Sequence, residues 1–132
     1  MKKKNNILKR EEGFTLIEII AVLIILGILA AVAIPKYFDL QEDAREMALK
    51  GAVAEGVGRI NAHFGEAVLG GSTPGEINYT DSTLGTDAGD FTLSYTGGAA
   101  GATTDITVTA EGNTGGVDGV SDTKSVNRPG TD

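Results

Sequence analysis

The chain has 132 residues, a formal net charge of −7 and no cysteine. This length allows one small domain beside an apolar segment, and the absence of cysteine excludes a disulfide framework. The charge is uneven, because residues 1–13 hold five basic and two acidic side chains whereas residues 14–132 hold six basic and 16 acidic ones. An acidic body of this kind argues against nucleic-acid binding, which requires a basic surface.

A long apolar segment follows the basic leader. Residues 14–34 would span about 31 Å as a helix, which matches the core of a bilayer. The basic leader would keep the N-terminus in the cytoplasm. A secretory signal peptide cleaved after Ala31 or Ala33 is one interpretation, and a plain single-pass anchor is another. Neither explains Glu18, because a lone carboxylate inside such a segment is costly without a partner.

The residues around Glu18 form an extended motif. Gly13 to Glu18 reads GFTLIE, and the segment continues without charge through Gly27 to Pro35. This pattern resembles the class III signal of type IV pilins and of type II secretion pseudopilins. The resemblance implies that a prepilin peptidase cuts between Gly13 and Phe14, and that Phe14 becomes N-methylphenylalanine. Residues 1–13 would then be a cleaved leader, and residues 14–35 would remain as the transmembrane and assembly half of a helix.

The resemblance also implies an assembly role for Glu18. Cleavage would create a cationic amine at Phe14, and Glu18 would meet the Phe14 amine of a neighbouring subunit. Pairing within one subunit is also possible, because positions i and i+4 share a helix face. The desolvation cost of the carboxylate, on the order of a few kcal/mol, would be offset when a neighbour docks in register. A carboxylate that only reaches the membrane interface is the alternative interpretation.

Beyond Pro35 the apolar residues recur at steps of three or four, which predicts an amphipathic helix over residues 36–69 that ends at Gly70-Gly71. Pro35 lacks an N–H and predicts a kink, and Gly27 weakens an earlier turn. In filaments that the sequence resembles, the stretch matching Gly27 to Pro35 can lose helical order. The block PKYFDLQEDAR, starting at Pro35, is most similar to major pilins of MSHA-type (mannose-sensitive haemagglutinin) pili. The predicted apolar face consists of Leu40, Ala44, Met47, Val53, Val57, Ile60, Phe64 and Val68.

Residues 70–132 are rich in Gly, Thr, Asp and Ser, and disorder is one interpretation. Two alternating runs, residues 91–96 and 106–110, instead predict a β-hairpin. Ile77 and Tyr79 suggest a third strand, whereas the segment from Gly112 to Asp132 shows no periodicity and is expected to be a loose tail. A hairpin alone is marginally stable, so the sheet is expected to pack on the helix. The expected fold class is therefore α+β, a long N-terminal helix against a small antiparallel sheet, as in pilins.

The remaining chemistry-bearing residues give few signals. Asp118 and Asp122, with Ser121 nearby, are weak calcium candidates, because the resemblance includes pseudopilins that bind calcium near the C-terminus. Hard cations need six to eight oxygen ligands, and solvated turn residues are the alternative interpretation. His63 is the only histidine, and it is expected to face solvent on the helix. No catalytic constellation or phosphate-binding loop is apparent, so neither an enzyme nor a cofactor is expected.

The sequence thus favours the major structural subunit of a type IV pilus. The resemblance implies polymerisation through the N-terminal helix into a surface filament for adhesion, attachment or motility. The expected partners are other copies of the chain, prepilin peptidase and the inner-membrane assembly machinery. The precursor is expected in the inner membrane and the product in an extracellular filament. Two alternatives stay open: the major pseudopilin of a type II secretion system, in a periplasmic pseudopilus, and a monomeric membrane-anchored extracytoplasmic binding module.

Overall fold

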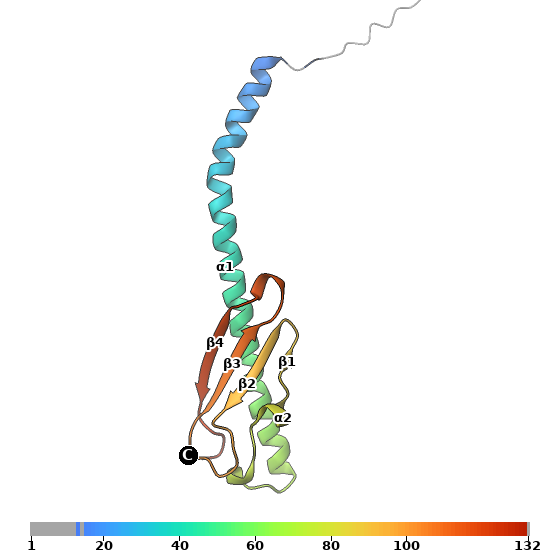
Figure 1. Cartoon of the computed structure of the whole chain (residues 1–132), viewed down its shortest axis with the longest axis vertical. Helices are drawn as coiled ribbons and strands as arrows, with labels where there is room; N and C mark the ends of the chain where they lie inside the picture. The colour runs from blue at the N-terminus through green and yellow to red at the C-terminus, as the bar shows by residue number, and fades with distance from the viewer. Residues whose placement is uncertain (1–12, 14, 132) are drawn as a thin grey trace, which may run out of the picture. The chain divides into compact units, whose positions relative to one another are not determined.

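The computed structural model describes residue 13 and residues 15–131, and the chain forms two compact units that divide after Leu40. Helix α1 extends from Leu16 to Leu69 and is followed by a small antiparallel sheet, which confirms the α+β prediction (Figure 1). The predicted long helix is therefore confirmed over these residues, whereas Phe14 lies outside the part of the chain that the structure describes.

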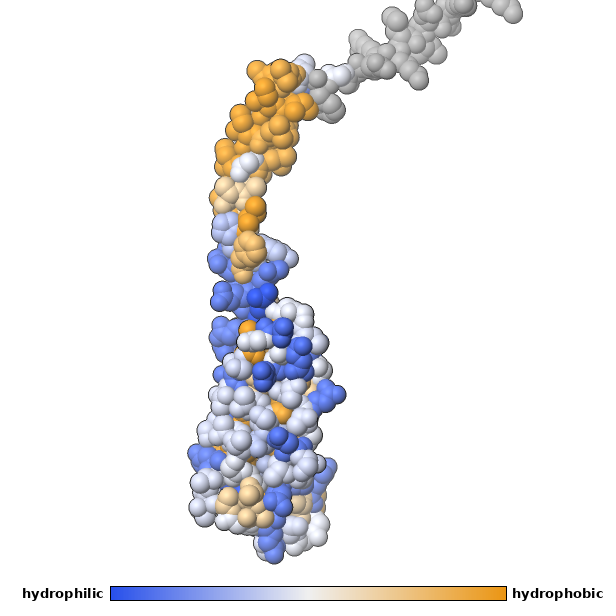
Figure 2. Space-filling view, viewed as in Figure 1, coloured by the Kyte–Doolittle hydropathy of each residue, from blue (hydrophilic) through white to orange (hydrophobic). Residues whose placement is uncertain are grey.

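In the first unit, the stretch of α1 from Ile19 to Ile34 carries no charged side chain. Its large hydrophobic side chains are exposed, and Figure 2 shows this stretch as almost uniformly hydrophobic on the visible face. By length and composition it can cross a membrane, since an 18-residue window reaches a mean hydropathy of 3.0 with no residue of the window buried. The helix continues through Pro35. The kink expected there stays a prediction.

In the second unit, α1 buries one face against the sheet. The buried helix residues are Leu49, Ala52, Val53, Gly56 and Ile60, and Val57 and Phe64 pack at the margin of the same core.

The predicted apolar face is confirmed at Val53 and Ile60 but wrong at Met47 and Val68, which are 69% and 42% exposed. Met47 precedes the buried Leu49 by two residues, which turns it about 200° around the helix from Leu49. Leu40, in the first unit, is also exposed, at 57%. Apolar residues at steps of three or four can lie on more than one face of the helix, and the sheet covers only the face that contains Leu49.

Two glycines end α1 as predicted. Gly71 adopts a φ of +92°, and its N–H donates to the carbonyl of Val68 at 3.0 Å. The N–H of Ser72 donates to the carbonyl of Ala67, also at 3.0 Å. This pair of hydrogen bonds is the Schellman arrangement, in which a left-handed residue satisfies carbonyls at the end of a helix.

The sheet has four antiparallel strands in the order β1-β2-β3-β4. The strands are β1 (Asp87–Ala88), β2 (Phe91–Thr96), β3 (Ile106–Gly112) and β4 (Ser121–Val126). The predicted hairpin is β2 and β3, with Leu93 opposite Ala110 and Tyr95 opposite Val108. Alternate residues of both strands enter the core, as the period-two pattern indicates.

Two expectations for the sheet were wrong. Ile77 and Tyr79 are buried but belong to no strand, since they lie in the connection between two short helices, η1 (Pro74–Glu76) and α2 (Asp81–Leu84). Tyr79 instead donates its N–H to the carbonyl of Gly98, at 2.7 Å. The region expected to be a loose tail contains a short helix η2 (Gly115–Val117) and strand β4. Strand β4 escaped prediction because none of its side chains is fully buried and its pattern is polar.

Candidate functional site

The candidate processing and assembly site lies where α1 begins. Gly13 is exposed and non-helical, Thr15 precedes the helix, and Glu18 is in the first helical turn. Phe14, which the sequence predicts as the new N-terminus and the methylated residue, lies outside the described residues. Cleavage between Gly13 and Phe14 therefore stays a prediction. The structure adds the arrangement of the two polar side chains that follow.

Thr15 and Glu18 form a reciprocal pair of hydrogen bonds. The backbone N–H of Thr15 donates to Oε2 of Glu18 at 2.8 Å, and the backbone N–H of Glu18 donates to Oγ1 of Thr15 at 3.3 Å. The carbonyl of Thr15 accepts the first helical hydrogen bond, from Ile19 at 3.2 Å. Thr15 is therefore the N-cap of α1, and the pair is a capping box. The spacing T-x-x-E in the sequence signals this box, but neither the ion pair nor the interfacial carboxylate expected from the sequence included it.

The two residues expected to loosen the helix, Gly27 and Pro35, both lie within α1. A Cβ atom added to Gly27 would meet no other atom within 4 Å, so nothing in the described chain requires a glycine there. Glycine lowers helix propensity by about 1 kcal/mol relative to alanine, and an internal proline removes one backbone hydrogen bond. Both residues thus weaken the helix locally, which is compatible with the predicted loss of order.

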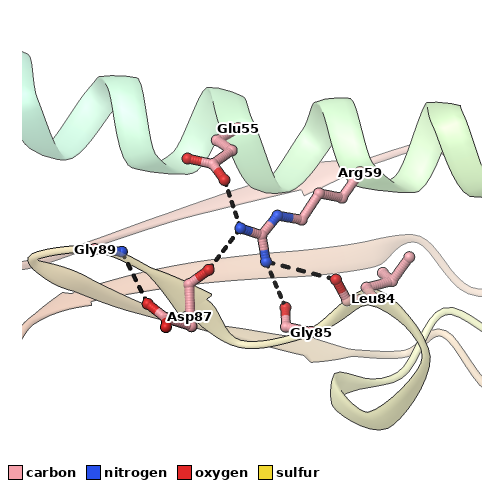
Figure 3. Close-up of polar contacts among 6 residues, drawn as sticks. All are labelled: Glu55, Arg59, Leu84, Gly85, Asp87 and Gly89. Atoms are coloured by element: carbon pink, nitrogen blue, oxygen red, sulfur yellow. Dashed lines mark hydrogen bonds and ion pairs between the residues drawn. The ribbon is translucent and has the colours of Figure 1, made fainter.

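A second polar cluster, centred on Arg59, connects α1 to the segment before β2 (Figure 3). The guanidinium donates to the carbonyls of Gly85 and Asp87, at 2.9 and 2.6 Å, and forms an ion pair with Glu55 one turn earlier on the helix. The hydrogen bond that the guanidinium donates to the Glu55 carboxylate raises the pKa of Arg59 above its ordinary value. Arg59 thereby holds the link between α2 and β1 against the helix, a role that the sequence pattern gave no way to predict.

Comparison with known proteins identifies the family. Residues 8–34 match the model of the prokaryotic N-terminal methylation motif. The "Type IV narrow pilus major component PilA5" of Thermus thermophilus is 34% identical over 106 residues, covering 67% of this chain and 90% of that protein. The chain belongs to the type IV pilin family. "Fimbrial protein Q" of Moraxella bovis is 36% identical over 93 residues, covering 68% of this pilin and 52% of the relative. A "Fimbrial protein" of Pseudomonas aeruginosa is 34% identical over 92 residues, covering 58% and 54%.

Family membership gives the N-terminal site its context. The pilin spans about half the length of the Moraxella and Pseudomonas relatives and nine-tenths of the Thermus one. No solved structure matches it. Type IV pilins are structural proteins, and their family implies processing of a precursor and assembly into a pilus. The methylation motif and the exposed apolar helix fit a membrane-anchored precursor of this kind.

The C-terminal segment of the pilin is fixed by a buried cation. Arg128 is 3% exposed, donates through Nη2 to the carbonyl of Ile77, and lies 5.0 Å from the centroid of the Tyr79 ring. Its Nε and Nη1 have no hydrogen-bond partner among residues 15–131. His63 packs edge-to-face on the same ring, at 5.9 Å between centroids, and is half-buried. The expectation that His63 faces solvent was therefore wrong, because the loop carrying Tyr79 crosses it.

The calcium candidates gain no support from their surroundings. Asp118 is exposed, and Asp122 is half-buried in β4, where its Oδ1 accepts the N–H of Thr123 at 2.8 Å. Within the described part of the chain, no three or more His, Asp or Glu side chains gather closely enough to hold a metal ion. A calcium site normally needs more oxygen ligands than these two side chains provide.

Proposed function

We propose that this pilin is the major structural subunit of a type IV pilus, a helical homopolymer on the cell surface used for adhesion, attachment or motility. The observation that carries the proposal is the place of Glu18, a single carboxylate in the first turn of α1, in a stretch that carries no other charge up to Ile34 and lies within the methylation motif. The printed names of two relatives, a major pilus component and a major alpha-pilin, support the same role.

The proposed maturation begins in the inner membrane. The precursor spans it with the basic leader in the cytoplasm, as the positive-inside rule predicts. Prepilin peptidase removes residues 1–13 by cutting between Gly13 and Phe14, and Phe14 is N-methylated. The inner-membrane pilus machinery then transfers the subunit into an extracellular filament.

The proposed division of the mature chain follows its chemistry. Residues 14–35 form the transmembrane and assembly half of the helix, residues 36–69 form its amphipathic half, and residues 70–132 form the β domain. In the filament the carboxylate of Glu18 pairs with the Phe14 amine of a neighbour.

Gly27 and Pro35 contribute at a different level. Each weakens α1 where it lies, and we propose that the helix between them loses order when subunits pack. This loosening would let the apolar half adapt to its neighbours without altering the β domain.

The decisive experiment is mass spectrometry of sheared surface filaments from cells that express the full chain and a prepilin peptidase. The expected subunit lacks residues 1–13 and carries one methyl group on Phe14. Gly13→Val should leave the precursor uncut and abolish filaments, whereas Asn6→Ala, a matched change inside the leader, should alter neither. Recovery of an intact N-terminus from filaments would contradict the proposal. Processed protein confined to the periplasm would indicate a secretion pseudopilin.

A further inference from the structure

We propose that Thr15 is a positioning residue for Glu18. Through the capping box it holds one oxygen of the Glu18 carboxylate at the start of its own helix and leaves the other oxygen for the amine of a neighbouring subunit. This proposal rests on the proposed function, because it concerns the contact by which subunits would assemble.

The hydrogen bonds divide the Glu18 carboxylate into two parts. Oε2 accepts the Thr15 N–H at 2.8 Å, while Oε1 accepts no hydrogen bond from any residue that the structure describes. The return bond, from the Glu18 N–H to Oγ1 of Thr15 at 3.3 Å, fixes the distance between the two residues from the other side. A carboxylate has enough lone pairs to accept both a backbone N–H and a cation. Capping and intermolecular pairing are therefore compatible in geometry.

The expected cleavage removes neither residue of the capping box. All four atoms of the two hydrogen bonds belong to Thr15 and Glu18, which both lie after the expected cut between Gly13 and Phe14. The box can thus form in the precursor and persist in the mature subunit. A side chain that is ordered before binding loses less conformational freedom when its partner arrives. Thr15 would supply that order to Glu18 ahead of assembly.

The membrane strengthens the argument. The first four N–H groups of a helix have no partner within the helix, and in lipid no water replaces one. The capping box satisfies the N–H groups of Thr15 and Glu18 with the side chains of the same two residues. Glu18 therefore has two separable properties: its side chain accepts a hydrogen bond, and it carries a negative charge. Only the second is required to pair with an amine.

Conservative substitutions separate these properties. Thr15→Val removes the hydroxyl and keeps the branched shape, whereas Thr15→Ser keeps the hydroxyl. Glu18→Gln keeps an acceptor that a capping box tolerates but removes the charge. A residue that only caps the helix would act independently of the charge at Glu18, whereas a residue that positions the carboxylate would act through it.

The experiment is competitive assembly. Each full-length variant is co-expressed with the wild-type chain, and mass spectrometry compares its share of the sheared filaments with its share of the membrane pool. Thr15→Val should be processed normally yet enter filaments roughly fivefold less, an effect equivalent to the loss of a typical N-cap. Thr15→Ser should enter as well as wild type. In a Glu18→Gln background, Thr15→Val should cause no further reduction, because coupled residues are non-additive.

Three results would overturn the proposal. Equal entry of Thr15→Val and wild type would show that the box has no role in assembly. Multiplicative effects of Thr15→Val and Glu18→Gln would show that Thr15 acts only as a helix cap. Loss of processing in Thr15→Val would assign Thr15 to the peptidase. In each case wild-type filaments still form, whereas their absence would refute the proposed function and this inference with it.

Discussion

Gly56 lies on the buried face of α1 against the side chains of the sheet, and its replacement tests the packing of the second unit. A Cβ atom added there would lie 2.5 Å from Cγ1 of Val108, and 3.5 and 3.6 Å from Oη of Tyr95 and Cδ1 of Leu93. Val108 is fully buried in β3 and has a stiff, branched side chain, so it has little room to move. Gly56→Ala should therefore force the helix and the sheet apart.

Two opposing effects set the size of this change. Alanine in place of glycine normally stabilises a helix by about 1 kcal/mol. Overpacking a well-filled core costs about 1–3 kcal/mol. With a contact as short as 2.5 Å, the second effect should win, and we expect Gly56→Ala to lower the free energy of unfolding by about 1–2 kcal/mol.

Gly58 and Gly51 provide the matched controls, because a Cβ atom at either position meets nothing within 4 Å. Gly58→Ala and Gly51→Ala should each stabilise the protein, by up to about 1 kcal/mol. The assay is guanidinium unfolding of the full chain in detergent, followed by near-ultraviolet circular dichroism, which reports on the buried Tyr79 and Tyr95. Equal stabilisation by Gly56→Ala and Gly58→Ala would refute the proposed close packing.

Substitutions at three further residues, Arg59, Arg128 and Tyr95, test the polar groups of the second unit. Arg59→Ala should lower the free energy of unfolding by about 1–2 kcal/mol and speed hydrogen exchange around Gly85. The control Lys50→Ala, which breaks an exposed ion pair of the same spacing, should lower it by less than about 0.5 kcal/mol. Equal losses would contradict the role of Arg59 in holding this segment against the helix. Arg128→Met should leave the denaturation midpoint nearly unchanged or raise it, because burying a cation without a carboxylate partner is costly. Arg128→Ala should instead lower the free energy of unfolding by about 2 kcal/mol, because it leaves a cavity. An equally large loss in Arg128→Met would contradict this reasoning. Burial raises the pKa of Tyr95 above its ordinary value of 10.0, so Tyr95 ionises first in the unfolded state and stability is lost as pH rises above about 10. Tyr95→Phe should reduce this loss of stability at alkaline pH. An unchanged pH profile of unfolding in that variant would contradict the reasoning.

Sequence periodicity predicted the parts of this fold in which apolar side chains are buried at regular steps. Helix α1, its glycine stop, and the β2–β3 hairpin all place apolar residues at regular steps on a buried face. The same reasoning failed where backbone hydrogen bonds or single polar contacts decide. Strand β4 pairs with β3 through its backbone and buries no residue fully, so its sequence carries no alternating pattern.

The candidate sites follow the same division. Glu18 was singled out because a charge in an apolar segment is conspicuous in any sequence. Thr15 drew no attention, although its spacing from Glu18 is that of a capping box. The contacts that Arg59 and Arg128 make with distant segments could not be predicted, because their acceptors there are the carbonyls of Gly85, Asp87 and Ile77, and a carbonyl is present in every residue.

The exposed apolar helix of the first unit explains why one polar contact would carry so much weight in assembly. Its side chains are exposed in the isolated chain, so their environment must be lipid or neighbouring helices. Transfer between these two environments replaces one apolar contact by another and gives little hydrophobic gain. Packing alone would then fix the axial register of a smooth apolar helix only weakly. A carboxylate held at one level by Thr15 differs in energy between a paired and an unpaired register, and this difference is what would select the register in the proposed filament.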